Sequence, residues 1–213
     1  PCFEAKFQKN KKRLGKLTRR YRLYRKWEEA VFAKGSRTQI LLITDREVPL
    51  YREIYGTEPE RFHLLPPNID RRTFSESDRE SARLAKLAEL GQAADTTLLL
   101  MVGSGFRTKG VDRAIEGLAK LQSTESNKTQ LVVVGHGKPD SYQRLARSLG
   151  VGDRVHMLGG RADVPEWMLA ADLLVHPARN ENTGTVLLEA LANGLPLLVS
   201  DVCGYAFHIE RAN

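Results

Sequence analysis

Two glutamates eight residues apart, Glu181 and Glu189, stand on either side of the start of a predicted helix. The loop between them contains Thr183, Gly184 and Thr185, and either threonine can cap a helix whose free N–H groups then face an anion. Glu181 lies in the loop and Glu189 lies about one turn into the helix, where carboxylates can accept hydrogen bonds from sugar hydroxyls. Taken alone, however, two glutamates at this spacing are more often ordinary surface charges.

A second loop offers positive charge. Residues 103–110 read Gly-Ser-Gly-Phe-Arg-Thr-Lys-Gly, so that Gly103 and Ser104 allow close backbone approach while Arg107 and Lys109 supply two cations. The spacing fits neither the Walker A loop nor the glycine pattern of dinucleotide-binding proteins. It suits a phosphate or diphosphate that is held by charge, and a tight turn with two solvated cations is the alternative.

Histidine and cysteine indicate less chemistry. His136, His156 and His176 lie at or near predicted strand ends, but their spacing of 20 residues matches no zinc motif. Cys203 lies near His208, and no third residue is placed to complete a nucleophilic set. We therefore expect ordinary polar roles for these side chains, with no metal site.

Both charged loops follow strands in the region from Thr96 onward. The strands are predicted at 97–102, 130–134, 154–158, 172–176 and 196–200, and the helices between them at 111–121, 141–149, 164–170 and 185–192. This alternation is typical of an α/β fold, with a parallel sheet and helices on both faces. Because right-handed crossovers place every strand-to-helix loop at one edge of the sheet, we expect Lys109 and the start of the last helix to meet there.

The residues before this region are expected to belong to a second domain. A strand, a helix and another strand are predicted at 39–44, 47–55 and 62–65. The segment Pro66-Pro67-Asn68-Ile69-Asp70 then stops regular structure and suits an interdomain linker. We place the domains at residues 1–68 and 69–213, and predict that a charged helix at 75–90 begins the second.

Positive charge is concentrated near the start of the chain. The 213 residues include 33 Lys and Arg against 26 Asp and Glu, a net charge of +7, and 11 basic residues and no acidic one lie between Lys6 and Lys26. Large apolar residues recur at the spacing of one helix face, at Phe3, Phe7, Leu14, Leu17, Tyr21, Tyr24, Trp27 and Val31. We predict one basic amphipathic helix over 3–33, with its apolar stripe over 3–31. The stripe either packs on a domain core or docks on an acidic surface, which is anionic lipid or nucleic acid.

Composition limits the class of protein further. With 41% hydrophobic and 28% charged residues, the sequence is typical of a globular protein. The longest apolar runs are too short to span a bilayer, and no signal peptide is visible. Cys2 and Cys203 are 201 positions apart, which favours a reducing compartment over a disulfide framework. Because the chain does not begin with Met, we expect it to be part of a longer protein.

Several motifs in order resemble the retaining glycosyltransferases of family 4. They are Gly-Ser-Gly-Phe…Lys-Gly at 103–110, Val-Val-Val-Gly at 132–135, Ala-Ala-Asp-Leu-Leu-Val-His-Pro at 170–177, and Glu181-x7-Glu189. Flanking matches, such as Thr-Glu-Pro-Glu-Arg-Phe at 57–62 and Val-Cys-Gly-Tyr-Ala at 202–206, are similar to the members that add glucose to the lipopolysaccharide core. The resemblance implies the GT-B fold, in which two Rossmann-like domains face each other and the C-terminal one holds the donor. It also implies that residues 1–68 are the end of the N-terminal domain.

The resemblance implies a UDP-sugar site with Lys109 and Glu181 as its catalytic residues. Lys109 and a nearby arginine would neutralise the leaving diphosphate, and Glu181 would contact the hydroxyls of the transferred glucose. Family members carry a basic residue directly before this lysine, whereas Thr108 stands there in this chain and Arg107 one position earlier. The resemblance also implies that the N–H groups of Thr183, Gly184 and Thr185 bind the distal phosphate and that the Glu189 carboxylate binds the ribose. It implies further that Arg161 and Val164 lie beside the uracil and that Arg72 is another arginine in contact with the donor.

The implied reaction transfers glucose from UDP-glucose to a heptose of the lipopolysaccharide inner core. It would need no metal or other cofactor and would retain the anomeric configuration. The resemblance also implies a cytoplasmic protein held on the anionic face of the bacterial inner membrane by helix 3–31, with no nucleic acid as partner. Because the acceptor-binding part would precede Pro1 and the family's C-terminal tail would follow Asn213, we expect this chain to be inactive alone.

Other functions stay open at this point. One is a different UDP-sugar-dependent hexosyltransferase, or a nucleotide-sugar epimerase on the same architecture. Another is a nucleic-acid-binding module, which the basic helix and the isoelectric point of about 9.5 would suit, and whose affinity would fall steeply with salt. A catalytically inactive remnant of the family is the last alternative.

Overall fold

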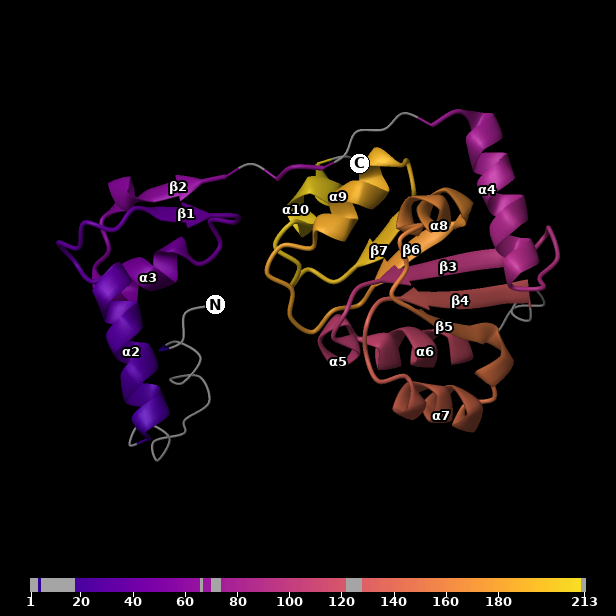
Figure 1. Cartoon of the computed structure of the whole chain (residues 1–213), viewed down its shortest axis with the longest axis horizontal. Helices are drawn as coiled ribbons and strands as arrows, with labels where there is room; N and C mark the ends of the chain where they lie inside the picture. The colour runs from indigo at the N-terminus through magenta and orange to yellow at the C-terminus, as the bar shows by residue number, and fades with distance from the viewer. Residues whose placement is uncertain (1–3, 5–17, 66, 70–73, 122–127, 212–213) are drawn as a thin grey trace. The chain divides into compact units, whose positions relative to one another are not determined.

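The computed structural model describes residues 4, 18–65, 67–69, 74–121 and 128–211 (Figure 1). The chain divides into two compact units, residues 1–68 and residues 69–213. Among the described residues, we find no helix that is both long and apolar enough to cross a lipid bilayer.

The larger unit is built on one parallel sheet. Its strands are β3 (Thr97–Val102), β4 (Thr129–Val134), β5 (Val155–Gly159), β6 (Leu173–His176) and β7 (Leu197–Val199), in the spatial order β5-β4-β3-β6-β7. β3 pairs with β4 on one side and with β6 on the other, so the strand order reverses at β3. In sheets of this kind, ligands bind outside the carboxyl ends of the strands at the point of reversal.

Different helices cover the two faces of the sheet. Leu98 and Leu100 of β3 pack with α8 (Val164–Ala170) and α9 (Thr185–Ala192), whereas Met101 packs with α6 (Val111–Ala119) and α7 (Asp140–Ser148). This division follows from the alternation of side chains along a strand. α4 (Glu76–Glu89) packs against α8 and so belongs to the first face. The predicted α/β class, with helices on both faces of a parallel sheet, is confirmed (Figure 1).

Two short helices depart from the predicted pattern. α5 (Phe106–Lys109) forms inside the 103–110 segment, which we predicted as a loop, and α10 (Ala206–Glu210) follows β7. Gly105 and Gly110 bound α5 with φ of +76° and +77°, a left-handed conformation in which glycine carries no steric cost. A single helical turn therefore closes between them, and this turn sets the position of Lys109.

The smaller unit contains a parallel pair of strands, β1 (Ile40–Leu42) and β2 (Phe62–Leu64). Between them lie α3 (Val48–Tyr55) and the 3₁₀ turn η2 (Pro59–Arg61), while α2 (Arg19–Phe32) precedes both strands. Tyr51 of α3 is buried and its ring stacks on Phe32 of α2 at 4.0 Å between centroids. The predicted strands and the predicted helix of this part are confirmed, with ends that differ by at most two residues.

The prediction of one continuous helix over 3–33 is wrong at Thr18. Thr18 has extended backbone and is the N-cap of α2, where its hydroxyl accepts a hydrogen bond from Tyr21 N at 3.2 Å. A threonine that caps a following helix cannot also continue a preceding one. Residues 5–17 of the predicted helix lie outside the described residues. Within α2, Tyr21 is buried, whereas Tyr24 and Trp27 are 39% and 55% exposed.

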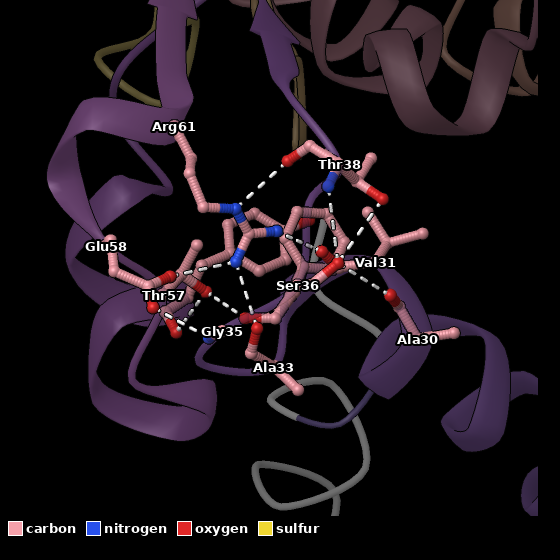
Figure 2. Close-up of polar contacts among 11 residues, drawn as sticks. Ala30, Val31, Ala33, Gly35, Ser36, Thr38, Thr57, Glu58 and Arg61 are labelled. Atoms are coloured by element: carbon pink, nitrogen blue, oxygen red, sulfur yellow. Dashed lines mark hydrogen bonds and ion pairs between the residues drawn. The ribbon is translucent and has the colours of Figure 1, made fainter.

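Arg61 fastens the C-terminal end of α2 to the rest of this unit (Figure 2). Its guanidinium is buried and donates to the carbonyl oxygens of Val31, Ala33 and Thr38, and also to Glu58 Oε2 at 3.0 Å. The last carbonyls of a helix have no intrahelical donor, so Arg61 replaces the missing partners. Figure 2 shows these bonds converging on one side chain.

Glu58 is the carboxylate partner in this network. The N–H of Gly35 donates to it at 2.7 Å, and this bond, followed by the bond from Arg61, lowers the pKa of Glu58 to about 2. The ionised form therefore stabilises the folded unit at neutral pH. That contribution is lost as the pH falls from the ordinary value of 4.5 through about 2, because the unfolded chain then binds the proton first.

An Arg61→Met variant should loosen α2 selectively. Methionine occupies much of the same space but donates no hydrogen bond, so the carbonyls of Val31, Ala33 and Thr38 and the Glu58 carboxylate lose the buried guanidinium, at a cost of about 3 kcal/mol. Hydrogen exchange read by mass spectrometry should then show α2 amides exchanging about a hundredfold faster. Arg37→Met, at an exposed position of the same unit, is the control and should leave exchange unchanged. Equal exchange in both variants would contradict this role of Arg61.

Candidate functional site

The loops that follow β3, β4, β5 and β6 converge at one edge of the sheet. The loops after β3 and β4 are so close that a Cβ added to Gly135 would lie 2.2 Å from Gly103 O. In the same way, a Cβ on Gly110 would lie 2.1 Å from Pro177 O. The loops after β3 and β6 are therefore in direct contact. The loop after β5 packs at Gly160 against the loop after β4. The convergence expected from the strand-helix alternation is therefore present.

Lys109 and Glu181 form an ion pair within this cluster of loops. Lys109 is the last residue of α5 and Glu181 lies in the loop after β6, and their side chains are 19% and 11% exposed. Nζ of Lys109 and Nε2 of His176 contact the same carboxylate oxygen, Oε2 of Glu181, the histidine at 3.4 Å. His176 ends β6 and is fully buried. The predicted cation and carboxylate thus meet directly.

Burial sets the protonation of these groups. It lowers the pKa of the Lys109 ammonium, and it lowers the pKa of His176 to about 4, an effect to which the charge of Lys109 adds. His176 is therefore neutral at pH 7, and Lys109 supplies the positive charge that Glu181 balances. Because an unfolded histidine titrates near 6.5, stability falls as the pH drops from 6.5 towards 4, where the unfolded chain binds more protons.

Helix α9 begins in a different way from the one predicted. We expected Thr183 or Thr185 to cap it, but its N-cap is Gly184, with φ of +82° and no side-chain cap. The left-handed glycine turns the chain into the helix by itself, so no side-chain oxygen occupies the first N–H groups. A Cβ on Gly184 would lie 3.3 Å from Cγ of Glu181, which places that carboxylate beside the start of α9.

The segment after β7 supports the loop that carries Glu181. Glu181 and Cys203 form a backbone bridge, and Tyr205 N donates to Thr183 O at 2.9 Å. A side chain on Gly204 would collide with the backbone of the same loop. The Cys-Gly-Tyr motif at 203–205, which in the sequence carries only a family resemblance, therefore fixes the position of the loop that carries Glu181.

A cavity of 380 Å³ lies beside α9. Its lining joins Glu189 and Val164, the residues predicted for the ribose and the uracil, with Phe74, Val102, Pro165, Met168 and Asn193. Burial raises the pKa of Glu189, so its ionised form gains from any hydrogen bond that a ligand donates. A larger apolar groove of 480 Å³ between α6 and β7 contains none of the predicted site residues.

Arg161, three residues before the cavity-lining Val164, is held by carboxylates. It donates to both oxygens of Asp163, at 2.8 and 2.7 Å, and pairs with Glu89 at 3.0 Å. Asp163 in turn contacts the buried Lys86 and precedes Val164, the first residue of α8. The described residues that line the cavity do not include Arg161.

The remaining predicted residues lie in the loop after β3 or beyond the described part. Ser104 accepts a hydrogen bond from His136 N at 3.0 Å, and Arg107 is exposed on α5. Arg72 falls outside the described residues. Within the ranges that the structure covers, no group of three His, Cys, Asp or Glu is arranged to hold a metal ion.

Arg179, which the sequence pattern did not single out, ties the loops after β3 and β6 together. Its guanidinium donates to both carboxylate oxygens of Asp112, at 2.6 and 2.7 Å. The backbone N–H of Arg179 donates to Thr108 O at 2.8 Å. The sequence did contain one indication of this role, because Arg179 is a charged residue between a buried strand and Glu181. The contact of His176 with Glu181 was not predicted either, because the spacing of the histidines indicates only the absence of a metal motif and not the side-chain neighbours of a strand end.

The sequence of this chain is similar to those of known glycosyltransferases. Residues 83–212 match the family model of the glycosyl transferases group 1. The lipopolysaccharide glucosyltransferase WaaG of Escherichia coli strain K12 is 46% identical over all 213 residues, which span 57% of that protein. D-inositol 3-phosphate glycosyltransferase 1 of Catenulispora acidiphila is 32% identical over 188 residues, which are 83% of this chain and 44% of the relative.

The fold agrees with these relatives. A crystal structure of WaaG, a glycosyltransferase involved in lipopolysaccharide biosynthesis, matches with a TM-score of 0.90 at 45% identity, over all of this chain and 57% of that one. The chain thus spans about half the length of the relatives it matches. Because the family model covers more than half of the residues, including the whole sheet and the Lys109–Glu181 pair, this chain belongs to the group 1 glycosyltransferases.

Proposed function

We propose that this chain is the donor-binding part of a retaining glucosyltransferase, which transfers glucose from UDP-glucose to a heptose of the lipopolysaccharide inner core. The contact between Lys109 and Glu181 beside the start of α9 carries the proposal. It brings together a cation for a diphosphate, a carboxylate for sugar hydroxyls, and helix N–H groups for a phosphate. The 46% identity to a lipopolysaccharide glucosyltransferase supports the choice of sugar and acceptor.

The cavity beside α9 suits the nucleoside. Glu189 would accept hydrogen bonds from the ribose hydroxyls, which favour its ionised form against the effect of burial. Val164, the first residue of α8, lines the cavity and offers an apolar surface for the uracil. Arg161, three residues earlier in the chain, is proposed to lie beside the uracil as well. Arg72 is proposed as a further contact to the donor.

Donor binding would exchange the partners of Lys109. The diphosphate takes the ammonium from Glu181, whose carboxylate then accepts hydrogen bonds from the glucose hydroxyls. As the bond between the sugar and the diphosphate breaks, negative charge grows on the leaving group. Lys109, Arg107 and the N–H groups of Thr183, Gly184 and Thr185 stabilise that charge more strongly in the transition state than in the ground state. These groups are proposed to act in place of a metal.

Retention follows when the acceptor hydroxyl attacks from the face that the diphosphate leaves. The departing diphosphate takes the proton of that hydroxyl, so the new glycosidic bond forms where the old bond breaks. The acceptor would bind to residues outside the 213 of this chain, since the relatives are about twice as long. We therefore expect this chain alone to bind the donor but not to transfer the sugar.

Isothermal titration of the 213-residue chain tests the donor assignment. UDP-glucose should bind about tenfold more tightly than UDP-galactose, because inverting one hydroxyl leaves a polar contact unpaired. Glu189→Gln should weaken binding of UDP and of both UDP-sugars alike, by about tenfold, since it acts on the shared ribose. Glu116→Gln, at an exposed position on α6, is the control. Absence of UDP binding would reject the proposal.

We also propose that the protein is cytoplasmic and sits on the inner face of the bacterial membrane, and exposed side chains of helix α2 support the membrane contact. Tyr24 and Trp27 are exposed and their rings meet edge to face at 5.4 Å, with the Arg20 guanidinium 5.5 Å from the Tyr24 ring. Exposed aromatic rings beside cationic side chains suit the interface of an anionic bilayer.

Vesicle sedimentation should show binding that depends on anionic lipid. Vesicles with anionic lipid should recruit the chain and neutral vesicles should not, because each basic residue near the surface adds about 1 kcal/mol. Replacing Tyr24 and Trp27 with serine should weaken binding, and added salt should do the same. Phe207→Ser removes an exposed aromatic ring from α10 and serves as the control. Equal recruitment by both kinds of vesicle would contradict the electrostatic contribution.

A further inference from the structure

His176 is an unusual residue to bury completely beside an ion pair. It is 0% exposed at the carboxyl end of β6, a strand that pairs on both sides, with β3 and with β7. Because a carboxylate oxygen only accepts hydrogen bonds, Nε2 carries the proton and donates to Glu181 at 3.4 Å. Nδ1 is then a bare acceptor, and it is buried without a partner in the described part of the chain.

The two oxygens of Glu181 are used unequally. Lys109 Nζ and His176 Nε2 both contact Oε2, and among the described residues no hydrogen bond reaches Oε1. The two donors also differ in mobility. The Lys109 ammonium is at the end of a flexible side chain, whereas the His176 ring is fixed by burial. If Lys109 leaves for a phosphate, His176 is the donor that remains on Oε2.

We infer that His176 is a positioning residue, which holds Oε2 of Glu181 from the core so that Oε1 stays directed to the hydroxyls of the transferred sugar. The inference rests on the proposed function and deepens it, since it assigns sugar recognition to a pair of residues. Burial keeps the ring neutral, and the neutral ring keeps donating when Lys109 exchanges its partner. An unpaired Nδ1 costs free energy, and the orientation of Glu181 is what the protein gains in return.

The test compares side chains that differ in reach at position 176. In the complete product of the gene, a Gln amide can place a donor near the position of Nε2, whereas the shorter Asn amide cannot, and Leu offers none. Dissociation constants for UDP and for UDP-glucose are measured for His176→Gln, His176→Asn and His176→Leu. UDP lacks the sugar, so it reports on the rest of the site.

We expect His176→Asn and His176→Leu to weaken UDP-glucose binding by about tenfold while UDP binding changes less than about twofold. His176→Gln should restore most of the loss. In a Glu181→Ala background, His176→Asn should have no further effect on UDP-glucose, because the residue acts only through that carboxylate. If His176→Leu does not fold, the Asn and Gln variants carry the comparison.

Other results would overturn the inference. Equal losses for UDP and UDP-glucose would indicate a general packing role, as would a loss in the Asn variant that persists after Glu181 is removed. Equal behaviour of the Asn and Gln variants would also reject it. Failure of the proposed function is distinguishable from all of these, because the unsubstituted protein would then fail to bind UDP-glucose.

Discussion

Replacing Lys109 with alanine in the complete gene product is expected to lower kcat for transfer from UDP-glucose by about a thousandfold. The ammonium is partly buried. In the proposed reaction it would therefore meet the leaving diphosphate in surroundings of low dielectric, where its charge acts strongly. Glu181→Ala should cause a loss of similar size by removing the acceptor for the sugar hydroxyls. Unchanged turnover in both variants would reject the assigned roles.

The loss of kcat on removing a cationic side chain should depend on how deeply that side chain is buried. Arg107 is exposed on α5, two residues before Lys109, and Arg107→Ala should cost only about tenfold because solvent screens its charge. Lys120→Ala removes an exposed lysine just past α6 and should leave kcat and KM unchanged. Steady-state kinetics with varied UDP-glucose separate these cases. A larger loss in Arg107→Ala than in Lys109→Ala would show that Arg107 meets the diphosphate.

The sheet of the larger unit was predictable because its strands are short apolar runs that end at glycine or at a polar loop. Leu98 to Val102 and Leu131 to Val134 are apolar at every position, as strands buried on both faces require. The convergence of Lys109 and Glu181 followed from the rule that parallel strands end at one edge. No side-chain detail was needed for either conclusion.

Side-chain partners and helix starts were not predictable in the same way. Thr183 and Thr185 are good capping residues, yet Gly184 begins α9 because the close approach of the segment after β7 fixes the loop. The turn of helix that presents Lys109 depends on left-handed glycines at both of its ends. Thr18 ends the predicted long helix by capping α2, a competition that spacing alone does not reveal. The start of α9 depends on a contact between distant segments, whereas the other two outcomes depend on local backbone conformation that the spacing of apolar and charged residues does not report.

The second large effect is expected at Gly110, where the loops after β3 and β6 touch. Gly110 has φ of +77°, and a Cβ there would lie 2.1 Å from Pro177 O, so alanine meets both backbone strain and a backbone collision. Gly110→Ala should lower the free energy of unfolding by about 3 kcal/mol. It should also weaken UDP binding by more than about tenfold, because the shift moves Lys109 away from Glu181.

Gly117 in the adjoining helix α6 provides the matched control. It has ordinary helical backbone and nothing lies within 4 Å of a Cβ added there, so Gly117→Ala should stabilise the protein by about 1 kcal/mol through helix propensity. Urea denaturation and UDP titration of both variants make the comparison. If Gly110→Ala folded as stably as Gly117→Ala and bound UDP equally well, the two loops could not be in the contact that brings Lys109 to Glu181. The donor site would then have to form without that contact, so the result reaches beyond stability to the geometry of the site.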